Sequence, residues 1–224
     1  MTDLLLCAVK QHNVPILALA ALVCGLPLII ALHIHAFAKK PRGKPPVAWL
    51  VIAGLTAGFG LWAAHLIMLM AHVPAVSIAS YGWWQVASLL TTLGATSLGF
   101  VFLNDERRFA WMYSGAAIAG GYAVFQICDL HMLGGDGELS RLVPIMLMLA
   151  SATTVACMAL LLYFKLDGEV GRWAAAVTMT LGLGAVHMMA MSLAVTCAQA
   201  GAHAAAKTTD KTQIGLAVGG LATG

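Results

Sequence analysis

The chain has 224 residues, of which 61% are hydrophobic and only 9% are charged, and its formal net charge is +3. Soluble domains carry roughly 25% charged residues, so this composition excludes an ordinary soluble domain and indicates a polytopic membrane protein. The basic residues form no long run, so nucleic acid is not an expected partner. The five cysteines are scattered without a Cys-x-x-Cys pair, which indicates neither a zinc ribbon nor a disulfide framework.

Six apolar segments are each long enough to cross a bilayer, for which about 20 residues are needed. The first is longer than the core of a signal peptide and its basic residues follow it, so we expect a retained helix. Gly54 and Gly58 are spaced for close packing of the second helix. An apolar stretch from about residue 212 is too short to span and is typical of an incomplete seventh helix. In chain order the expected helices are 14–38, 46–72, 83–103, 109–132, 142–164 and 173–195.

The positions of the basic residues predict the orientation in the membrane. Lys39, Lys40, Arg42 and Lys44 directly follow the first helix, and short cytoplasmic loops are enriched in Lys and Arg. We therefore expect the N-terminus to be extracytoplasmic and the loop that holds these four residues to be cytoplasmic. Together these patterns predict an all-α polytopic membrane helix bundle of six to seven helices, in one domain over residues 1–224, surrounded by the lipid bilayer.

Three histidines, His65, His131 and His187, stand on the second, fourth and sixth helices. Alternate helices run in the same direction, and a rise of about 1.5 Å per residue places all three in the outer half of the membrane. An ionisable side chain inside a membrane is costly and marks a functional site by default. The spacings of 66 and 56 residues between them indicate three repeated helix pairs. Each histidine has a sulfur three or four residues away, in Met68, Cys128 and Met191 respectively.

Imidazole and thioether groups on one helix face can ligate copper or haem iron. Thioethers and a thiol favour Cu(I), whereas zinc also uses carboxylates, of which Asp129 is the one well-placed candidate. Asp129 is either an interface residue or an acceptor for an imidazole N–H, and His12 is a candidate for a supporting role at the outer rim. For any one helix, a core histidine with methionine as apolar filler remains the alternative. His33 and His35, beside Lys39, are expected at the membrane interface.

The segments around the three histidines resemble a known family. They read GLWAAHLIMLMA, ICDLHMLGG and GAVHMMAMSLA, and each resembles a degenerate copy of the MHYT motif of bacterial membrane sensor domains. That motif is Met-His-Tyr-Thr, often followed by Gly-Met, near the outer ends of three helices. The resemblance covers about residues 12–197 and places His65, His131 and His187 at the motif histidines, with Met191 at the terminal methionine of the third copy.

The resemblance implies a bacterial inner-membrane protein that binds copper through His and Met and senses oxygen, carbon monoxide or nitric oxide. The methionine before each histidine is replaced here by Ala64, Leu130 or Val186, and Tyr and Thr are absent from every copy. Family members usually carry a cyclic-di-GMP (GGDEF and EAL), kinase or DNA-binding output domain. None is recognised in these residues, so we expect an output protein on the cytoplasmic side. Relocated soft ligands are expected among Met68, Cys128, Met132, Met188 and Met189.

The sequence as a whole predicts a copper-binding membrane sensory protein whose signal is a diatomic gas or the redox state. A haem-binding electron-transfer protein with His131 and His187 as axial ligands is one alternative. A metal transport or delivery protein is another, less favoured because the helices lack a polar path to the cytoplasm. We recognise no nucleophile–base pair or carboxylate dyad, so no enzymatic activity is expected. A homo-oligomer is compatible with the sequence.

Overall fold

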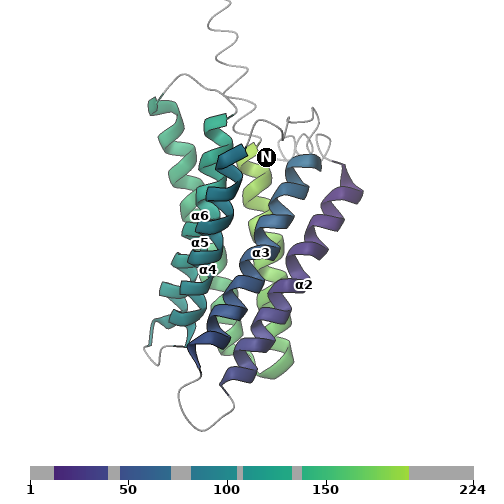
Figure 1. The fold of residues 1–224 in the computed structure, drawn as a ribbon, viewed down its shortest axis with the longest axis vertical. Coiled ribbons are helices and arrows are strands. Elements are labelled where there is room, and N and C mark those ends of the chain that lie inside the picture. Colours follow the sequence, from purple (N-terminus) through teal and green to yellow (C-terminus); the bar gives the residue numbers. More distant parts are fainter. Residues whose placement is uncertain (1–12, 40–45, 72–81, 105–107, 133–137, 192–224) are drawn as a thin grey trace, which may run out of the picture.

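The structure, a computed structural model, describes residues 13–39, 46–71, 82–104, 108–132 and 138–191. These residues form a bundle of α-helices, with no strand among them (Figure 1). The last helix carries no label in the figure, and we call it the 168–191 helix. In chain order the helices are α2 Val14–Ala38, α3 Val47–Ala71, α4 Gly82–Leu103, α5 Ala110–Met132, α6 Glu138–Lys165 and Gly168–Met191.

The predicted all-α membrane bundle is confirmed within the described residues. Five of their helices are long and apolar enough to cross a membrane, namely all except α5. The expected bounds agree with the structure at α2 and lie close to it for α3, α4 and α5, whereas α6 and the 168–191 helix begin four and five residues earlier than expected. The three repeated helix pairs and the single-domain division stay predictions. The stretch after residue 212 lies outside the described residues.

The helices run alternately up and down, so alternate helices are parallel (Figure 1). The N–H of Asn13 donates to the carbonyl of Ala71 at 2.9 Å, which joins the start of α2 to the end of α3. We call this end of the bundle the Asn13 end and the opposite one the Lys165 end. The described basic side chains Lys39, Arg108, Lys165 and Arg172 belong to the Lys165 end. The predicted cytoplasmic location of the loop after α2 would place the Lys165 end on that side, and this orientation stays a prediction.

Small residues allow the helices to approach closely. A Cβ added at Gly54 or Gly58 of α3 would overlap α4, at the Ser97 backbone and the Thr96 hydroxyl respectively. The close packing predicted from these two glycines is therefore confirmed, and Gly115 of α5 has the same role against α6. Without a hydrophobic driving force between helices in lipid, such tight packing is a main source of association.

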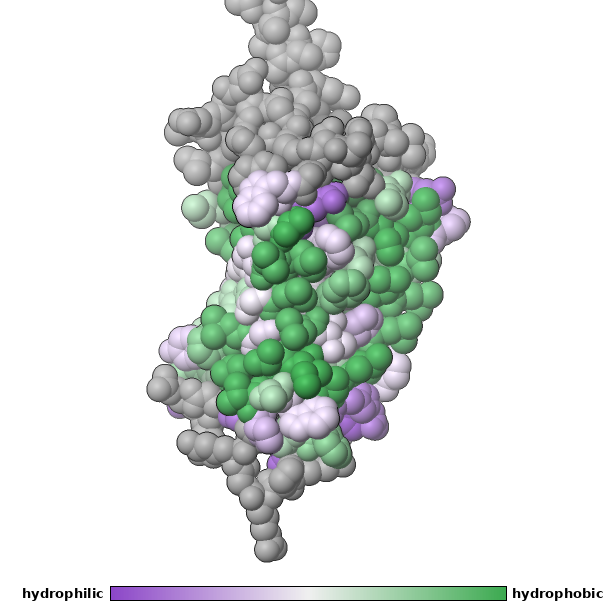
Figure 2. All heavy atoms as spheres, in the orientation of Figure 1, coloured by the Kyte–Doolittle hydropathy of each residue, from purple (hydrophilic) through white to green (hydrophobic). Residues whose placement is uncertain are grey.

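The outer surface of the bundle is apolar. Large side chains such as Leu22, Phe59 and Leu90 are more than half exposed. Figure 2 shows that hydrophobic residues dominate the middle of the visible face and that the more hydrophilic ones lie mainly toward the two ends. Exposed apolar surface of this extent is unfavourable in water but favourable against lipid chains. The chain is therefore treated as a multi-pass membrane protein.

Candidate functional site

Two of the three predicted site histidines lie together inside the bundle. His65 of α3 and His187 of the 168–191 helix are buried, with 2% and 0% of their surfaces exposed. Their ring centroids are 5.0 Å apart and the ring planes are perpendicular. Because α3 and the 168–191 helix are parallel, residues near their C-terminal ends meet at the Asn13 end (Figure 1). The buried pair is the centre of the candidate site.

A polar chain from α5 fixes the ring of His187. The Gln126 side-chain amide lies 2.9 Å from His187 Nδ1 and 3.1 Å from the Tyr122 hydroxyl. That hydroxyl donates in turn to the Leu183 carbonyl at 2.7 Å. Gln126 and Tyr122 are themselves buried, with 0% and 1% of their surfaces exposed. Leaving such a group without a partner would cost about 1–3 kcal/mol, so this chain holds the imidazole in one orientation.

The same contact selects the tautomer of His187. When the Gln126 NH₂ donates to Nδ1, that nitrogen is an acceptor and the proton of the neutral ring sits on Nε2. A 180° rotation of the Gln126 amide would exchange its NH₂ and Oε1 and would break the hydrogen bond to Tyr122. Oε1, which has no hydrogen bond to any described residue, would then face His187 Nδ1. Nδ1–H would then donate to Oε1 and leave the Nε2 lone pair for a ligand. This is the usual arrangement for a metal-bound histidine.

Thioethers stand within one helical turn of both rings. Met68 follows His65 by three residues and is 8% exposed, while Met191 follows His187 by four and is 1% exposed. Met188 is half-buried and lines a cavity beside the pair. These are the soft donors that the sequence predicted for the first and third copies of the motif. Met189, also half-buried, belongs to the same turn.

The remaining predicted ligands cannot be placed. Cys128, Asp129, His131 and Met132 have their backbones in α5, but their side chains lie outside the described part of the structure, as does all of His12. Among the described residues no three His, Cys, Asp or Glu side chains gather into a group that could hold a metal. The described donors are therefore two imidazoles and neighbouring thioethers.

The spacing of the two rings fits a shared metal ion. A metal–nitrogen bond of about 2.0–2.1 Å, with about 1.1 Å more to the ring centre, puts two imidazole centres about 5 Å apart on a tetrahedral ion. The observed separation between His65 and His187 is 5.0 Å. Two axial ligands on opposite sides of a haem would lie about 6 Å apart, with a porphyrin between them. The separation is compatible with one shared ion and also with ordinary edge-to-face packing of two rings. The haem alternative uses His131, whose side chain lies outside the described part of the structure.

A third buried histidine lies at the Lys165 end. His35 is 0% exposed, its Nδ1 lies 2.8 Å from the Tyr163 hydroxyl, and its ring packs edge-on against Tyr163 and Phe100. Its Nε2 has no hydrogen-bond partner among the described residues. The expectation that His35 lies at the interface is wrong, because its face of α2 turns toward α4 and α6. His33 is partly exposed, and its Nε2 lies 3.1 Å from a carboxylate oxygen of Glu169. This position agrees with the expected interfacial location.

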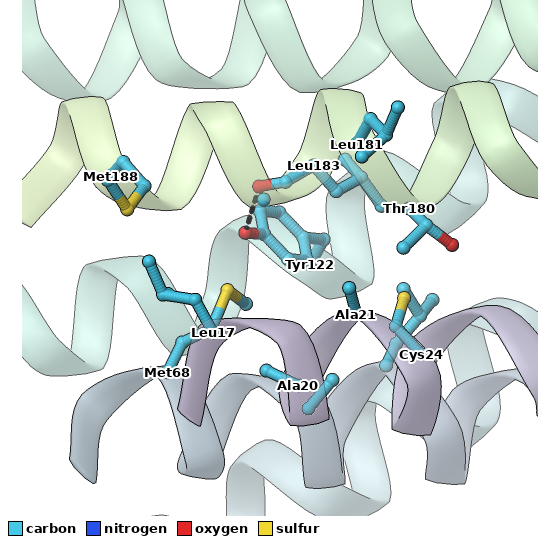
Figure 3. A pocket seen from close by; sticks show the side chains of 13 residues that line it. Leu17, Ala20, Ala21, Cys24, Met68, Tyr122, Thr180, Leu181, Leu183 and Met188 are labelled. Atoms are coloured by element: carbon cyan, nitrogen blue, oxygen red, sulfur yellow. Dashed lines mark hydrogen bonds between the residues drawn. The ribbon is translucent and has the colours of Figure 1, made fainter. Parts of the chain in front are cut away.

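A cavity of about 190 Å³ is lined by Ala64 and Met188, which adjoin His65 and His187 in the sequence. Figure 3 shows the side chains that surround it. Four helices surround it, and Tyr122, whose hydroxyl contacts Gln126, forms part of its wall. The lining residues are Leu17, Ala20, Ala21 and Cys24 of α2, Leu61, Ala64 and Met68 of α3, Tyr122 of α5, and Thr180, Leu181, Leu183, Gly184 and Met188 of the 168–191 helix.

Sequence reasoning missed Tyr122 and Gln126 as site residues. Both stand on α5 and are separated by four residues, which places them on one helix face. Gln126 is a polar side chain in an apolar span, two residues before Cys128, and this position is the signal that would have identified it.

Comparison with known proteins finds a relative that works in signalling. The chain is 25% identical over 137 residues to a protein of Caulobacter vibrioides described as an uncharacterized signaling protein. The match covers 61% of this chain but only 17% of that much longer protein. No family model matches the chain, and no solved structure matches it. The comparisons thus support a membrane protein of signalling type. They do not identify its ligand or its metal.

Proposed function

We propose that this chain is a copper-binding sensory domain of the bacterial inner membrane. The observation that carries the proposal is the pair of buried imidazoles, His65 and His187, 5.0 Å apart inside a membrane bundle. Two ionisable side chains at such a depth are costly inside a membrane and mark a functional site by default. The similarity to a signalling protein supports the sensory part of the proposal.

His65 and His187 are the proposed core ligands, with Met191 and Met68 as the nearest soft donors and His131 as a third imidazole. The thioethers favour Cu(I) over zinc, because copper in its reduced state prefers sulfur. Copper held there would supply a redox-active centre that binds small ligands. The chain contributes a dry, buried setting, and Gln126, once its amide is turned so that Oε1 accepts from Nδ1–H, would hold the His187 ring in a ligating orientation.

A change at this centre must reach the cytoplasm to act as a signal. The matched region makes up 17% of the signalling relative, so most of that protein lies outside the region that resembles this chain. We propose that the domain works with an output protein or domain at the Lys165 end. The helices that carry His65 and His187 run the full length of the bundle and are the proposed link to it.

Copper stoichiometry tests the proposal. The purified chain in detergent is loaded with Cu(I), freed of loose metal and analysed for copper per chain. We expect about one equivalent in the wild type, and loss of most of it in His65→Ala and His187→Ala, because each removes a central ligand. His33→Ala is the matched control, since it removes a partly exposed histidine far from the pair, and it should keep its copper. Equal copper in the wild type and in the variant lacking both His65 and His187 would overturn the proposal.

A further inference from the structure

The cavity beside the histidine pair is shaped for a ligand of its own. We propose that it binds a small, uncharged apolar molecule, about the size of benzene or smaller, that enters sideways from the bilayer. Binding in the cavity does not depend on copper. The inference can therefore be tested separately from the proposed metal site.

The size of the cavity sets the size of the ligand. Its volume is about 190 Å³. An engineered apolar cavity of about 150 Å³ in another protein stays dry and binds benzene or xenon. The space is partly open to the outside of the bundle, so the comparison with an enclosed cavity concerns its size alone. Small residues on facing helices, Ala20 and Ala21 of α2 and Gly184 of the 168–191 helix, leave this space open.

The walls select an apolar occupant over water. Most lining side chains are aliphatic or thioether groups, as Figure 3 shows for Leu17, Met68 and Met188. The Tyr122 hydroxyl already donates to the Leu183 carbonyl. The other polar side chains of the wall are the Thr180 hydroxyl and the Cys24 thiol, which lie close to each other. A water molecule needs two to four polar partners, and one hydroxyl beside a weakly bonding thiol is a poor set.

The mouth of the cavity opens toward lipid. Leu181 lines the cavity and is 64% exposed on the outer face of the 168–191 helix. Ala21, on α2 near the level of Thr180 and Leu181, is half-buried (Figure 3). The opening therefore lies between these two helices, at the depth of the membrane-spanning segments. Apolar solutes concentrate in the hydrocarbon of a bilayer, which places such a ligand directly at the mouth.

The cavity is connected to the histidine pair through its wall. The Tyr122 ring lines the cavity, its hydroxyl contacts Gln126, and Gln126 contacts His187. A molecule that presses on the Tyr122 ring therefore acts on the group that orients the His187 imidazole. This connection would allow a lipid-soluble signal to alter the proposed metal site without ligating the metal.

Xenon binding followed by ¹²⁹Xe NMR tests the inference on the purified, metal-free full chain in detergent. We expect a saturable xenon site that benzene displaces. Gly184→Leu should weaken it at least tenfold, because a Cβ at Gly184 meets no atom within 4 Å and the larger side chain extends into the open space. Gly94→Leu is the matched control: its Cβ also meets nothing within 4 Å, but it lies exposed on α4, away from the cavity, and should leave xenon binding unchanged.

Ala21→Leu fills the cavity from the α2 side and serves as an independent variant if Gly184→Leu does not fold. Absence of a saturable xenon site in the wild type would overturn the inference, whether the cavity closes or a detergent or lipid chain fills it. So would xenon affinity that is equal in the wild type and in the folded cavity-filling variants. A wild-type chain that binds xenon but no copper would overturn the metal site alone.

Discussion

The two ends of the bundle each bury a histidine completely, yet they surround it differently. His187 at the Asn13 end meets a second imidazole and nearby thioethers, and a glutamine orients its ring. His35 at the Lys165 end meets the rings of Phe100 and Tyr163 and the hydroxyl of the latter. Burial alone is therefore not what distinguishes a ligand site. The donors around the ring decide what it can do, and only the His187 region offers a set that fits a soft metal ion.

The aromatic surroundings of His35 suit a structural role. Its ring fills space between α2, α4 and α6 at 0% exposure, and the Tyr163 hydroxyl satisfies one ring nitrogen. Edge-to-face ring contacts of this kind add about 0.5–1.5 kcal/mol beyond the burial itself. The Asn13 end instead combines the histidine pair with an open cavity. The Lys165 end is thus tightly packed around its histidine, whereas the Asn13 end has a cavity near its histidine pair.

Removing the packed histidine gives the largest expected effect on stability. We expect His35→Ala to lower the free energy of unfolding in detergent by about 2–4 kcal/mol, because it leaves a cavity and an unsatisfied Tyr163 hydroxyl. Copper per folded chain should not change. Thermal or denaturant unfolding measures the first quantity and metal analysis the second. Loss of copper from folded His35→Ala protein would break the contrast between the two ends.

The orienting glutamine should matter for affinity. We expect Gln126→Leu to weaken Cu(I) binding by about 10- to 100-fold, since removal of the group that positions a ligating histidine typically has this effect. Competition with a Cu(I) chelator of known affinity gives the value. Gln85→Leu, a glutamine-to-leucine change on α4, is the matched control and should bind copper like the wild type. An unchanged affinity in Gln126→Leu would remove Gln126 from the site.

The hydroxyl partner of His35 should matter less. We expect Tyr163→Phe to lower the free energy of unfolding by about 0.5–1.5 kcal/mol, the usual net value of one hydrogen bond, and to leave copper affinity unchanged. Tyr113→Phe, at an exposed tyrosine of α5, controls for the loss of a hydroxyl in general. If both substitutions have the same effect on unfolding, the contact between His35 and Tyr163 adds no stability.

The smallest effect is expected at the thioether. Met191→Leu keeps the volume and removes the sulfur, so stability should change by less than about 1.5 kcal/mol. Cu(I) affinity should fall by less than about tenfold, because imidazoles remain as the main ligands. Met146→Leu, at an exposed methionine of α6, is the matched control. A complete loss of copper in Met191→Leu would mean that sulfur, and not the histidine pair, dominates the site.

The sequence predicts the helices well because their signal is length and hydrophobicity. The bounds of α2 were predicted correctly, since a proline stands in its first turn and basic residues follow its end. The starts of α6 and the 168–191 helix were placed too late, because their first turns are polar, as Glu138 and Glu169 show. A search for apolar runs does not detect a helical turn that extends beyond the apolar part of a span.

The candidate site was only partly predictable for a different reason. Parallel alternate helices bring His65 and His187 to one end, and that follows from helix order alone. The contact between Gln126 and His187 and the burial of His35 depend on how each helix is rotated about its own axis. In a soluble helix an apolar stripe reveals this rotation, whereas these helices are apolar on all sides. The inward face therefore becomes visible only in the folded bundle.

X-ray absorption at the copper edge tests most directly whether His65 and His187 hold one metal ion. In the Cu(I)-loaded wild-type chain we predict scattering from at least two imidazole rings at about 2.0 Å, together with sulfur at about 2.3 Å. The copper that His65→Ala still retains should have at least one imidazole fewer in its shell, while His33→Ala should give the wild-type spectrum. A copper shell without imidazole scattering, or one that is the same in His65→Ala, in His187→Ala and in the wild type, would contradict the account.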